Sequence, residues 1–168
     1  MDPSPRNATP EDRKKLFELI RDVHIAMLTT VDQDGSLRSR PMANKQSEAS
    51  DSLWFLTQAS AHTALEIEAE HQVSITFADP GLHSYVSISG RGRLIRDRAK
   101  AEELWSPYAK IWFPEGIDDP DLAILEVEMD KAEYWDSPSG AFISLFGLLH
   151  TLTGSPPRLG ENAKINFN

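Results

Sequence analysis

Short runs of apolar and β-branched residues recur along the chain, with polar or glycine-containing turns between them. This pattern is typical of β-strands that bury one or both faces. The turn at residues 32–35 joins the first two runs as a hairpin, because Gly35 can adopt positive φ. The expected strands are residues 24–31, 36–42, 52–57, 72–78, 84–96 and 122–136, the last of them bent or split near residue 130.

Four other segments carry apolar residues at helical spacing. Thr9, Ser60 and Asp97 stand where they can cap the first three of these helices. In the second helix, three acidic residues are expected to form a solvated face: Glu66, Glu68 and Glu70. The expected helices are residues 10–22, 61–70, 98–105 and 140–152, the last of them packing on the body or on a second subunit.

Strands dominate this arrangement, and they do not alternate regularly with helices as in a doubly wound sheet. Gly90 and Gly92 suggest a bulge in the long fifth strand, where a barrel would bend. The predicted fold is therefore mainly β: a small six-stranded antiparallel barrel with peripheral helices. We expect one domain over residues 9–152, a disordered segment at 1–8 and a loosely held tail at 153–168.

Composition narrows the classes of function. The 168 residues suit one ordinary domain, and a formal net charge of −9 argues against a nucleic-acid partner. The chain has no cysteine, which excludes disulfides, thiolate metal sites and a cysteine nucleophile. The polar start at residues 1–8 is no signal peptide, and no apolar run reaches the length of a membrane span. A cytoplasmic protein is the default expectation.

The stretch S-L-R-S-R-P-M at residues 36–42 is the first candidate site. Arg38 and Arg40 lie two positions apart, so an extended strand presents both guanidinium groups on one face. Pro41 removes a backbone donor and indicates a sheet edge, a bulge or a strand exit. These residues indicate either an anion-binding wall or two ordinary surface arginines on an exposed strand end.

The junction at residues 56–63 is the second candidate, because a strand ends there and a helix begins. Helix N-termini present free N–H groups and bind phosphate readily. Thr57, Ser60 and Thr63 offer hydroxyl groups, and His62 offers an imidazole. Together with the two arginines this junction predicts a monophosphate pocket, whereas simple capping by Ser60 would explain it without a ligand.

The sequence offers little support for a metal site, a dinucleotide-binding motif or a serine hydrolase. The five histidines show no short metal-ligand spacing, so no metal site is expected. Gly90-Arg91-Gly92 lacks the third glycine of a dinucleotide fingerprint, and no G-x-S-x-G elbow is present. No residue stands out as a catalytic acid or base.

The order of the motifs resembles a known family. R-S-R-P-M, L-W-F-L-T, S-A-H-T-A-L-E-I, V-S-I-T-F-A-D and Y-V-S-I-S-G-R-G follow one another as in FMN-binding split-barrel proteins of the pyridoxamine 5′-phosphate oxidase-like group, nearest to its general stress protein 26 branch. The resemblance runs from about Arg13 to Asp136. It implies a homodimer of six-stranded split barrels with two FMN sites at the subunit interface.

The resemblance also implies positions for the cofactor, with FMN expected and FAD possible. The ring and ribityl chain would be lined by Arg38, Ser39, Arg40, Pro41 and Met42. The flanking strand would supply Phe55, Leu56 and Thr57, and the phosphate would meet Ser60, His62 and Thr63. Lys110, Trp112 and Phe113 would reach across from the partner chain. Adjacent Trp and Phe residues more often pack in a core or an interface than against a cofactor, so a dimer-interface role is favoured for Trp112 and Phe113. Relatives often have lysine where Thr63 stands, so this chain lacks one cation at the phosphate.

The function expected from the resemblance is flavin binding, with hydride or electron transfer to a small molecule if the protein is an enzyme. Oxidation of pyridoxamine phosphate is not expected, because no second phosphate pocket is evident. The alternatives are a non-catalytic protein that binds or senses flavin and a cofactor-free barrel that acts as an interaction module.

Overall fold

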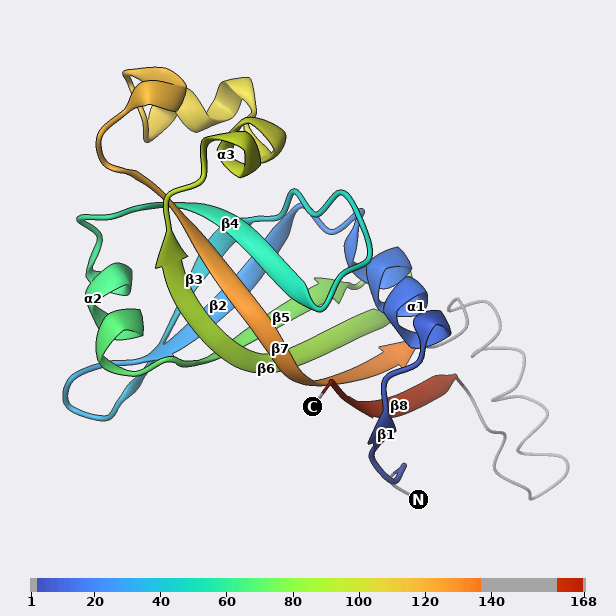
Figure 1. The fold of residues 1–168 in the computed structure, drawn as a ribbon. Coiled ribbons are helices and arrows are strands. Elements are labelled where there is room, and N and C mark those ends of the chain that lie inside the picture. The colour runs from blue at the N-terminus through green and yellow to red at the C-terminus, as the bar shows by residue number, and fades with distance from the viewer. Residues whose placement is uncertain (1–2, 137–159, 168) are drawn as a thin grey trace, which may run out of the picture.

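A curled eight-stranded sheet forms the body of the protein (Figure 1). The structure is a computed structural model that describes residues 3–136 and 160–167. The strands are β1 (Arg6–Asn7), β2 (Ile25–Val31), β3 (Leu37–Ala43), β4 (Ser52–Gln58), β5 (Gln72–Asp79), β6 (Ser84–Ile95), β7 (Leu122–Asp136) and β8 (Glu161–Asn166). The helices are α1 (Pro10–Ile20), α2 (His62–Ala69) and α3 (Arg98–Leu104), with 3-10 turns η1 (Pro107–Ile111) and η2 (Gly116–Asp118).

The six predicted strands and the mainly β architecture are confirmed. The strand order is β1-β8-β7-β6-β5-β2-β3. Strand β4 lies off this path and pairs with the first half of the long, bent β7, whereas β8 pairs with its second half. Within the described residues no ladder joins β3 to β4, so the barrel is split between these two strands instead of closed. The split leaves a gap in the wall at which a ligand can approach.

The two ends of the chain differ from the prediction. Arg6–Asn7 and Glu161–Asn166 were expected in irregular segments, yet they form β1 and β8, which pair in parallel while β8 extends the β7 ladder. Ala163 and Ile165 of β8 are buried in the core. The sequence shows no strand signal here because these runs are short and polar, and their pairing depends on β7. The helix predicted at 140–152 lies outside the described residues.

Two clusters of buried residues flank β4, because successive side chains of a strand point to opposite faces. Leu53 and Phe55 join the barrel core with residues of β2, β5, β6 and β7. Trp54 and Leu56 pack against the second cluster, which α3, η1 and the start of β7 supply. This alternation attaches the α3–η1 segment to the side of the barrel. None of the described helices has the length and apolarity needed to cross a membrane.

Helix α2 is attached to the sheet by an ion pair that the sequence does not reveal. Glu66 was predicted on a solvated face, but its residue surface is only 1% exposed. Arg40 Nη2 donates to Glu66 Oε2 at 2.7 Å, and the buried Thr30 hydroxyl donates to the same oxygen at 2.5 Å. Arg40 also donates to Thr30, so β2, β3 and α2 meet in one network. The Thr30 hydroxyl and the Arg40 guanidinium thus replace part of the water that the Glu66 carboxylate loses on burial.

The bulge predicted from the glycines of β6 is confirmed at Gly90, where the register with β7 shifts between Ser89 and Gly90. A Cβ atom at Gly90 would lie 2.1 Å from the Glu128 carbonyl oxygen. The strands therefore approach each other more closely than any side chain would permit.

Substitution of Arg40 by alanine should lower the free energy of unfolding by roughly 3 kcal/mol, because it removes the guanidinium that is hydrogen-bonded to the buried Glu66 carboxylate. Arg38→Ala is the matched control: its side chain is 53% exposed on the same strand, and its loss should cost less than about 1 kcal/mol. Urea unfolding of both variants measures the difference. Equal losses would contradict a structural role for the Arg40–Glu66 pair.

Gly90→Ala should destabilise the protein by roughly 2–4 kcal/mol, because the β6–β7 backbones must separate to admit the methyl group. Gly81→Ala in the β5–β6 turn is the control, since its nearest contact is a flexible Asp79 carboxylate oxygen at 3.3 Å. Thermal unfolding followed by circular dichroism compares them. A Gly90→Ala variant as stable as Gly81→Ala would show that the close approach is not enforced.

Candidate functional site

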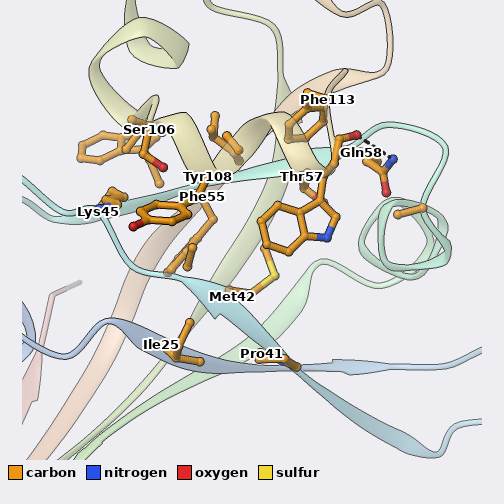
Figure 2. A pocket seen from close by; sticks show the side chains of 17 residues that line it. Ile25, Pro41, Met42, Lys45, Phe55, Thr57, Gln58, Ser106, Tyr108 and Phe113 are labelled. Atoms are coloured by element: carbon orange, nitrogen blue, oxygen red, sulfur yellow. Dashed lines mark hydrogen bonds between the residues drawn. The ribbon is translucent and has the colours of Figure 1, made fainter. Parts of the chain in front are cut away.

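A cavity of about 450 Å³ opens at the split in the barrel (Figure 2). It lies between the end of β3, the strand β4 and the α3–η1 segment. Its size falls within the usual range for small-molecule sites. The lining residues are Ile25, Pro41, Met42, Ala43, Lys45, Trp54, Phe55, Leu56, Thr57, Gln58, Ala61, Leu104, Ser106, Tyr108, Ala109, Trp112 and Phe113. Most of this lining is apolar, which suits a flat aromatic ligand.

A small number of polar groups interrupt the apolar lining. Figure 2 shows Lys45 and Ser106 on the Tyr108 side of the cavity, and Thr57 and Gln58 on the other. Gln58 Nε2 donates to the Trp112 carbonyl oxygen at 3.4 Å, which links η1 to β4 across the cavity. Among the described lining residues there is no carboxylate and no histidine. The described lining therefore supplies mainly binding contacts, and its ionisable side chains are Lys45 and Tyr108.

Two aromatic side chains at the cavity remain open to solvent. Tyr108, in η1, is 76% exposed, and Trp112, directly after η1, is 55% exposed. Neighbouring exposed apolar side chains that form a patch often mark a ligand- or partner-binding surface. Phe113 differs, because it is buried in the second cluster with its ring centroid 6.3 Å from that of Trp105. The packing alternative therefore applies to Phe113, and Trp112 stays available for a ligand or a partner.

Seven of the fourteen residues expected at a flavin site line this cavity: Pro41, Met42, Phe55, Leu56, Thr57, Trp112 and Phe113. The other seven do not belong to the lining: Arg38, Ser39, Arg40, Ser60, His62, Thr63 and Lys110. Ser39 pairs with Thr29 on the exposed face of the β2–β3 hairpin, with their hydroxyl oxygens 2.7 Å apart. Thr63 is half-buried in the first turn of α2, and Lys110 is exposed on η1.

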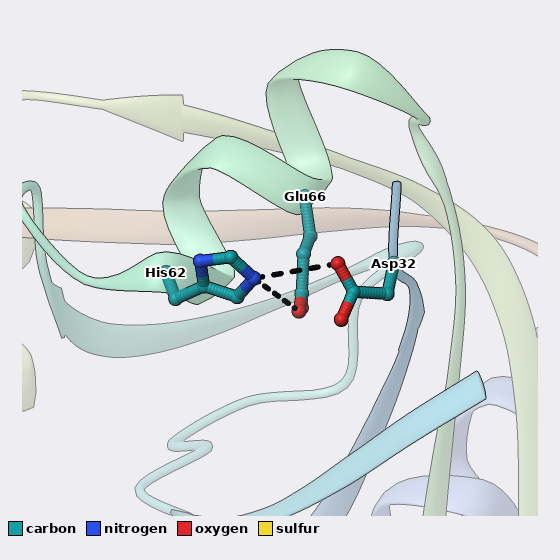
Figure 3. A group of neighbouring side chains, drawn as sticks. All are labelled: Asp32, His62 and Glu66. Carbon is teal, nitrogen blue, oxygen red and sulfur yellow. Dashed lines mark hydrogen bonds and ion pairs between the residues drawn. The ribbon is translucent and has the colours of Figure 1, made fainter. Parts of the chain in front are cut away.

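Arg38, Arg40 and His62 meet instead in a charged cluster, which we define as Asp32, Arg38, Arg40, His62 and Glu66. His62 Nε2 lies 3.4 Å from Asp32 Oδ1 and 3.4 Å from Glu66 Oε1 (Figure 3). Arg38 Nη1 donates to Asp32 Oδ2 at 3.0 Å, while its Nε lies 3.8 Å from Glu66 Oε1. The paired arginines and the start of α2 are thus close together, as the sequence pattern predicts.

The cluster carries no net charge when His62 is neutral, because two carboxylates oppose two guanidinium groups. The pKa of Asp32 is lowered, chiefly by the hydrogen bond from the Gln33 backbone N–H and then by Arg38. The pKa of Arg38 is raised by its hydrogen bond to Asp32. Both groups therefore stay ionised near neutral pH. The two arginines are consequently engaged by carboxylates and do not form an uncompensated cationic wall.

Ser60 does not cap α2, contrary to the prediction. The N-cap residue is Ala61, which provides no side-chain hydrogen bond to the helix. The Ser60 hydroxyl donates to Asp121 Oδ2 at 2.6 Å, and its backbone N–H donates to Asp121 Oδ1 at 2.8 Å. Asp121 thus binds the Ser60 hydroxyl that would otherwise be free to cap α2. Because Asp121 lies beyond η2 and far along the chain, a local sequence pattern cannot reveal this interaction.

Several residues of the site were missed from the sequence. Asp32 reads as an ordinary turn residue, and its contact with His62 depends on the fold of the β2–β3 hairpin. Glu66 follows His62 by four positions, and this spacing places both side chains on one side of a helix. The spacing is the one feature of the sequence that indicates their contact. Ile25 and Tyr108 line the cavity without belonging to any motif.

Comparisons with known proteins agree with this architecture. General stress protein 26 of Bacillus subtilis (strain 168) is 28% identical over 142 residues, which are 79% of this chain and 94% of the relative. A crystal structure from Jannaschia sp. CCS1, of the general stress protein 26 group, matches with a TM-score of 0.77 at 26% identity, covering 95% of this chain and all of that chain. The general stress FMN/FAD binding protein from Xanthomonas citri matches with a TM-score of 0.64 at 29% identity, covering 76% of this chain and 90% of that chain.

A family model described as pyridoxamine 5′-phosphate oxidase-like matches residues 11–157, which include the split, the cavity and the charged cluster. The motif order predicts the same family. The chain belongs to the pyridoxamine 5′-phosphate oxidase-like family and is a homologue of general stress protein 26.

Proposed function

We propose that this protein binds flavin, with the isoalloxazine ring in the cavity between β3 and β4. The observation that carries the proposal is the apolar cavity of about 450 Å³ at the split, edged by the exposed rings of Trp112 and Tyr108. A flat tricyclic ring gains most of its affinity from such surfaces. The family and the Xanthomonas citri neighbour, which is named as an FMN/FAD binding protein, support the same ligand class.

We further propose FMN as the preferred form, with FAD as the alternative. The cavity and the charged cluster are adjacent along two segments: Pro41 and Ala61 line the cavity, and Arg40 and His62 are their chain neighbours. A ring held between β3 and β4 therefore directs a ribityl chain toward the start of α2. Arg38, which is half-exposed, and the hydroxyl of Thr63 would contact the phosphate there.

A homodimer is part of the proposal. The lining residues Ile25, Tyr108 and Trp112 and the adjacent Ile111 are all more than half exposed, so the cavity edge is an apolar surface. A second copy of the chain would cover this surface and complete the wall of the site. Lys110 lies within the same segment and would face the partner. The acidic net charge of −9 disfavours nucleic acid as a partner.

A bound flavin supplies hydride or electron transfer, and the chain supplies the site for it. The apolar lining excludes water from one face of the ring, and Gln58 and Thr57 offer hydrogen bonds at its edge. Because the described lining has no carboxylate or histidine, the residues bind and orient more than they move protons. A protein that binds or senses flavin without turnover is therefore the second candidate function. The absence of carboxylates and histidines from the described lining is as compatible with this function as with a reductase of small molecules.

FMN titration tests the proposal. Purified protein should quench FMN fluorescence with one flavin per chain, and Trp112→Ala should weaken binding roughly tenfold, because a stacked aromatic ring contributes on the order of 1 kcal/mol beyond its buried area. Trp135→Ala is the control, since Trp135 is similarly exposed but lies on β7 away from the cavity. Absence of FMN and FAD uptake, or equal affinities of the two variants, would reject this site.

The same flavin-loaded samples separate the two candidate functions. Anaerobic addition of NADH or NADPH should bleach the absorbance band of the oxidised flavin if the protein is an oxidoreductase. An unchanged band, with flavin still bound, supports the binding protein. Titration with riboflavin measures how much the phosphate contributes to affinity.

Sedimentation velocity tests the dimer. The wild-type chain should sediment as a dimer, and Ile111→Glu should shift it toward monomer, because Ile111 is 73% exposed at the proposed interface without lining the cavity. Leu82→Glu in the β5–β6 turn is the control, since it replaces a similarly exposed apolar side chain elsewhere. A monomeric wild type, or a dimer that Ile111→Glu leaves intact, would refute this interface.

A further inference from the structure

One buried oxygen of the charged cluster lacks a hydrogen bond. Glu66 Oε2 accepts hydrogen bonds from Arg40 and Thr30, but Glu66 Oε1 has no hydrogen-bond partner, although the residue is 1% exposed. Leaving a buried carboxylate oxygen unsatisfied is costly, and such atoms in folded proteins usually have a partner. The atom faces the imidazole of His62 from across the first turn of α2 (Figure 3).

Three potential ligand atoms converge at this place. Asp32 Oδ1, His62 Nε2 and Glu66 Oε1 all lie within 4.8 Å of one another, and both distances from the imidazole nitrogen are 3.4 Å. In a tetrahedral site with bonds of about 2.1 Å, the ligand atoms stand roughly 3.4 Å apart. A hydrogen bond from His62 accounts for this geometry less well, because both contacts, at 3.4 Å, are longer than the roughly 2.7–2.9 Å usual for charge-assisted bonds.

We propose that Asp32, His62 and Glu66 bind a divalent transition cation of the zinc type. Two carboxylates and one imidazole are an ordinary ligand set for such ions, and three protein ligands leave a fourth position open. The site goes beyond the flavin proposal and does not rest on it, since none of its three ligands lines the cavity.

The surrounding residues hold the ligands in place. Arg40 and Thr30 donate hydrogen bonds to Glu66 Oε2, and Arg38 Nη1 donates to Asp32 Oδ2 at 3.0 Å. Each carboxylate is thereby turned so that its other oxygen faces His62 Nε2. Metal-ligating carboxylates are commonly oriented by such outer hydrogen bonds.

The two arginines also determine what completes the site. Without the metal the cluster is neutral, so a dication gives it an excess of two positive charges. This excess opposes the cation and is relieved when an anion takes the open fourth position. The fourth ligand is therefore a hydroxide or an inorganic or organic phosphate, not a further neutral side chain.

Cobalt titration of the flavin-free protein, after dialysis against a chelator, tests the proposal. One Co²⁺ per chain should bind with the visible absorption of a four-coordinate ion, and Zn²⁺ should displace it. His62→Ala should weaken binding roughly 100-fold or more, because even outer partners of metal ligands contribute about 10- to 100-fold. His71→Ala is the matched control: this exposed histidine lies just beyond the C-terminal end of α2.

Glu66→Gln removes a ligand but also alters the α2 attachment, so Asp32→Asn serves as the second ligand variant, with circular dichroism to confirm its fold. Loss of Co²⁺ binding in His62→Ala and Asp32→Asn, with retention in His71→Ala, supports the site. Unchanged binding in either ligand variant would overturn it. So would the absence of Co²⁺ uptake up to about 1 mM, well above the dissociation constants of specific sites, which would leave the triad as a group of hydrogen-bonded and ion-paired side chains.

Discussion

The buried carboxylate of Glu66 is the constraint on which the site depends. Removing this charge from water requires donors that approach from fixed directions, and Arg40 and Thr30 provide them from two neighbouring strands. Helix α2 therefore cannot slide along the sheet without breaking the network. Ala61 lines the cavity and His62 belongs to the charged cluster, and both residues stand at the start of α2. The Arg40–Glu66 ion pair therefore fixes the cavity and the charged cluster relative to β3.

The location of the cavity follows from the way the barrel is split. Strand β4 pairs with β7 on one side, and within the described chain its other side has no ladder. Strand β3 likewise pairs with β2 alone in that part of the chain. The gap between two such edges must be filled by side chains, by a ligand or by another chain. Residues of η1 fill part of it, but the exposed rings of Tyr108 and Trp112 leave its rim open.

The sequence predicts the regular elements well because their signals are local. Alternation and turn chemistry mark the six main strands, and Gly90 marks the bulge of β6. The sequence fails where a residue's environment comes from a distant segment. Glu66 looks like one acid of a solvated face until Arg40, from 26 positions earlier, is placed beside it, and Ser60 looks like a cap until Asp121 competes for it. For the same reason seven of the fourteen expected flavin residues line the cavity, three others (Arg38, Arg40 and His62) join the charged cluster, and the remaining four lie in neither.

The neutrality of that cluster has a consequence for ligand selection. An apolar cavity binds a ring through its surface, so discrimination among flavins depends on what the phosphate end meets. Two arginines already paired with two carboxylates offer a phosphate little net attraction, and Thr63 adds no charge. A proton on His62 or a cation between Asp32 and Glu66 would restore a positive field at this end. By thermodynamic linkage, a group that raises the affinity for phosphate is itself bound more tightly when phosphate is present. If both proposals hold, flavin phosphate and metal would therefore bind cooperatively, each relieving the charge that the other introduces.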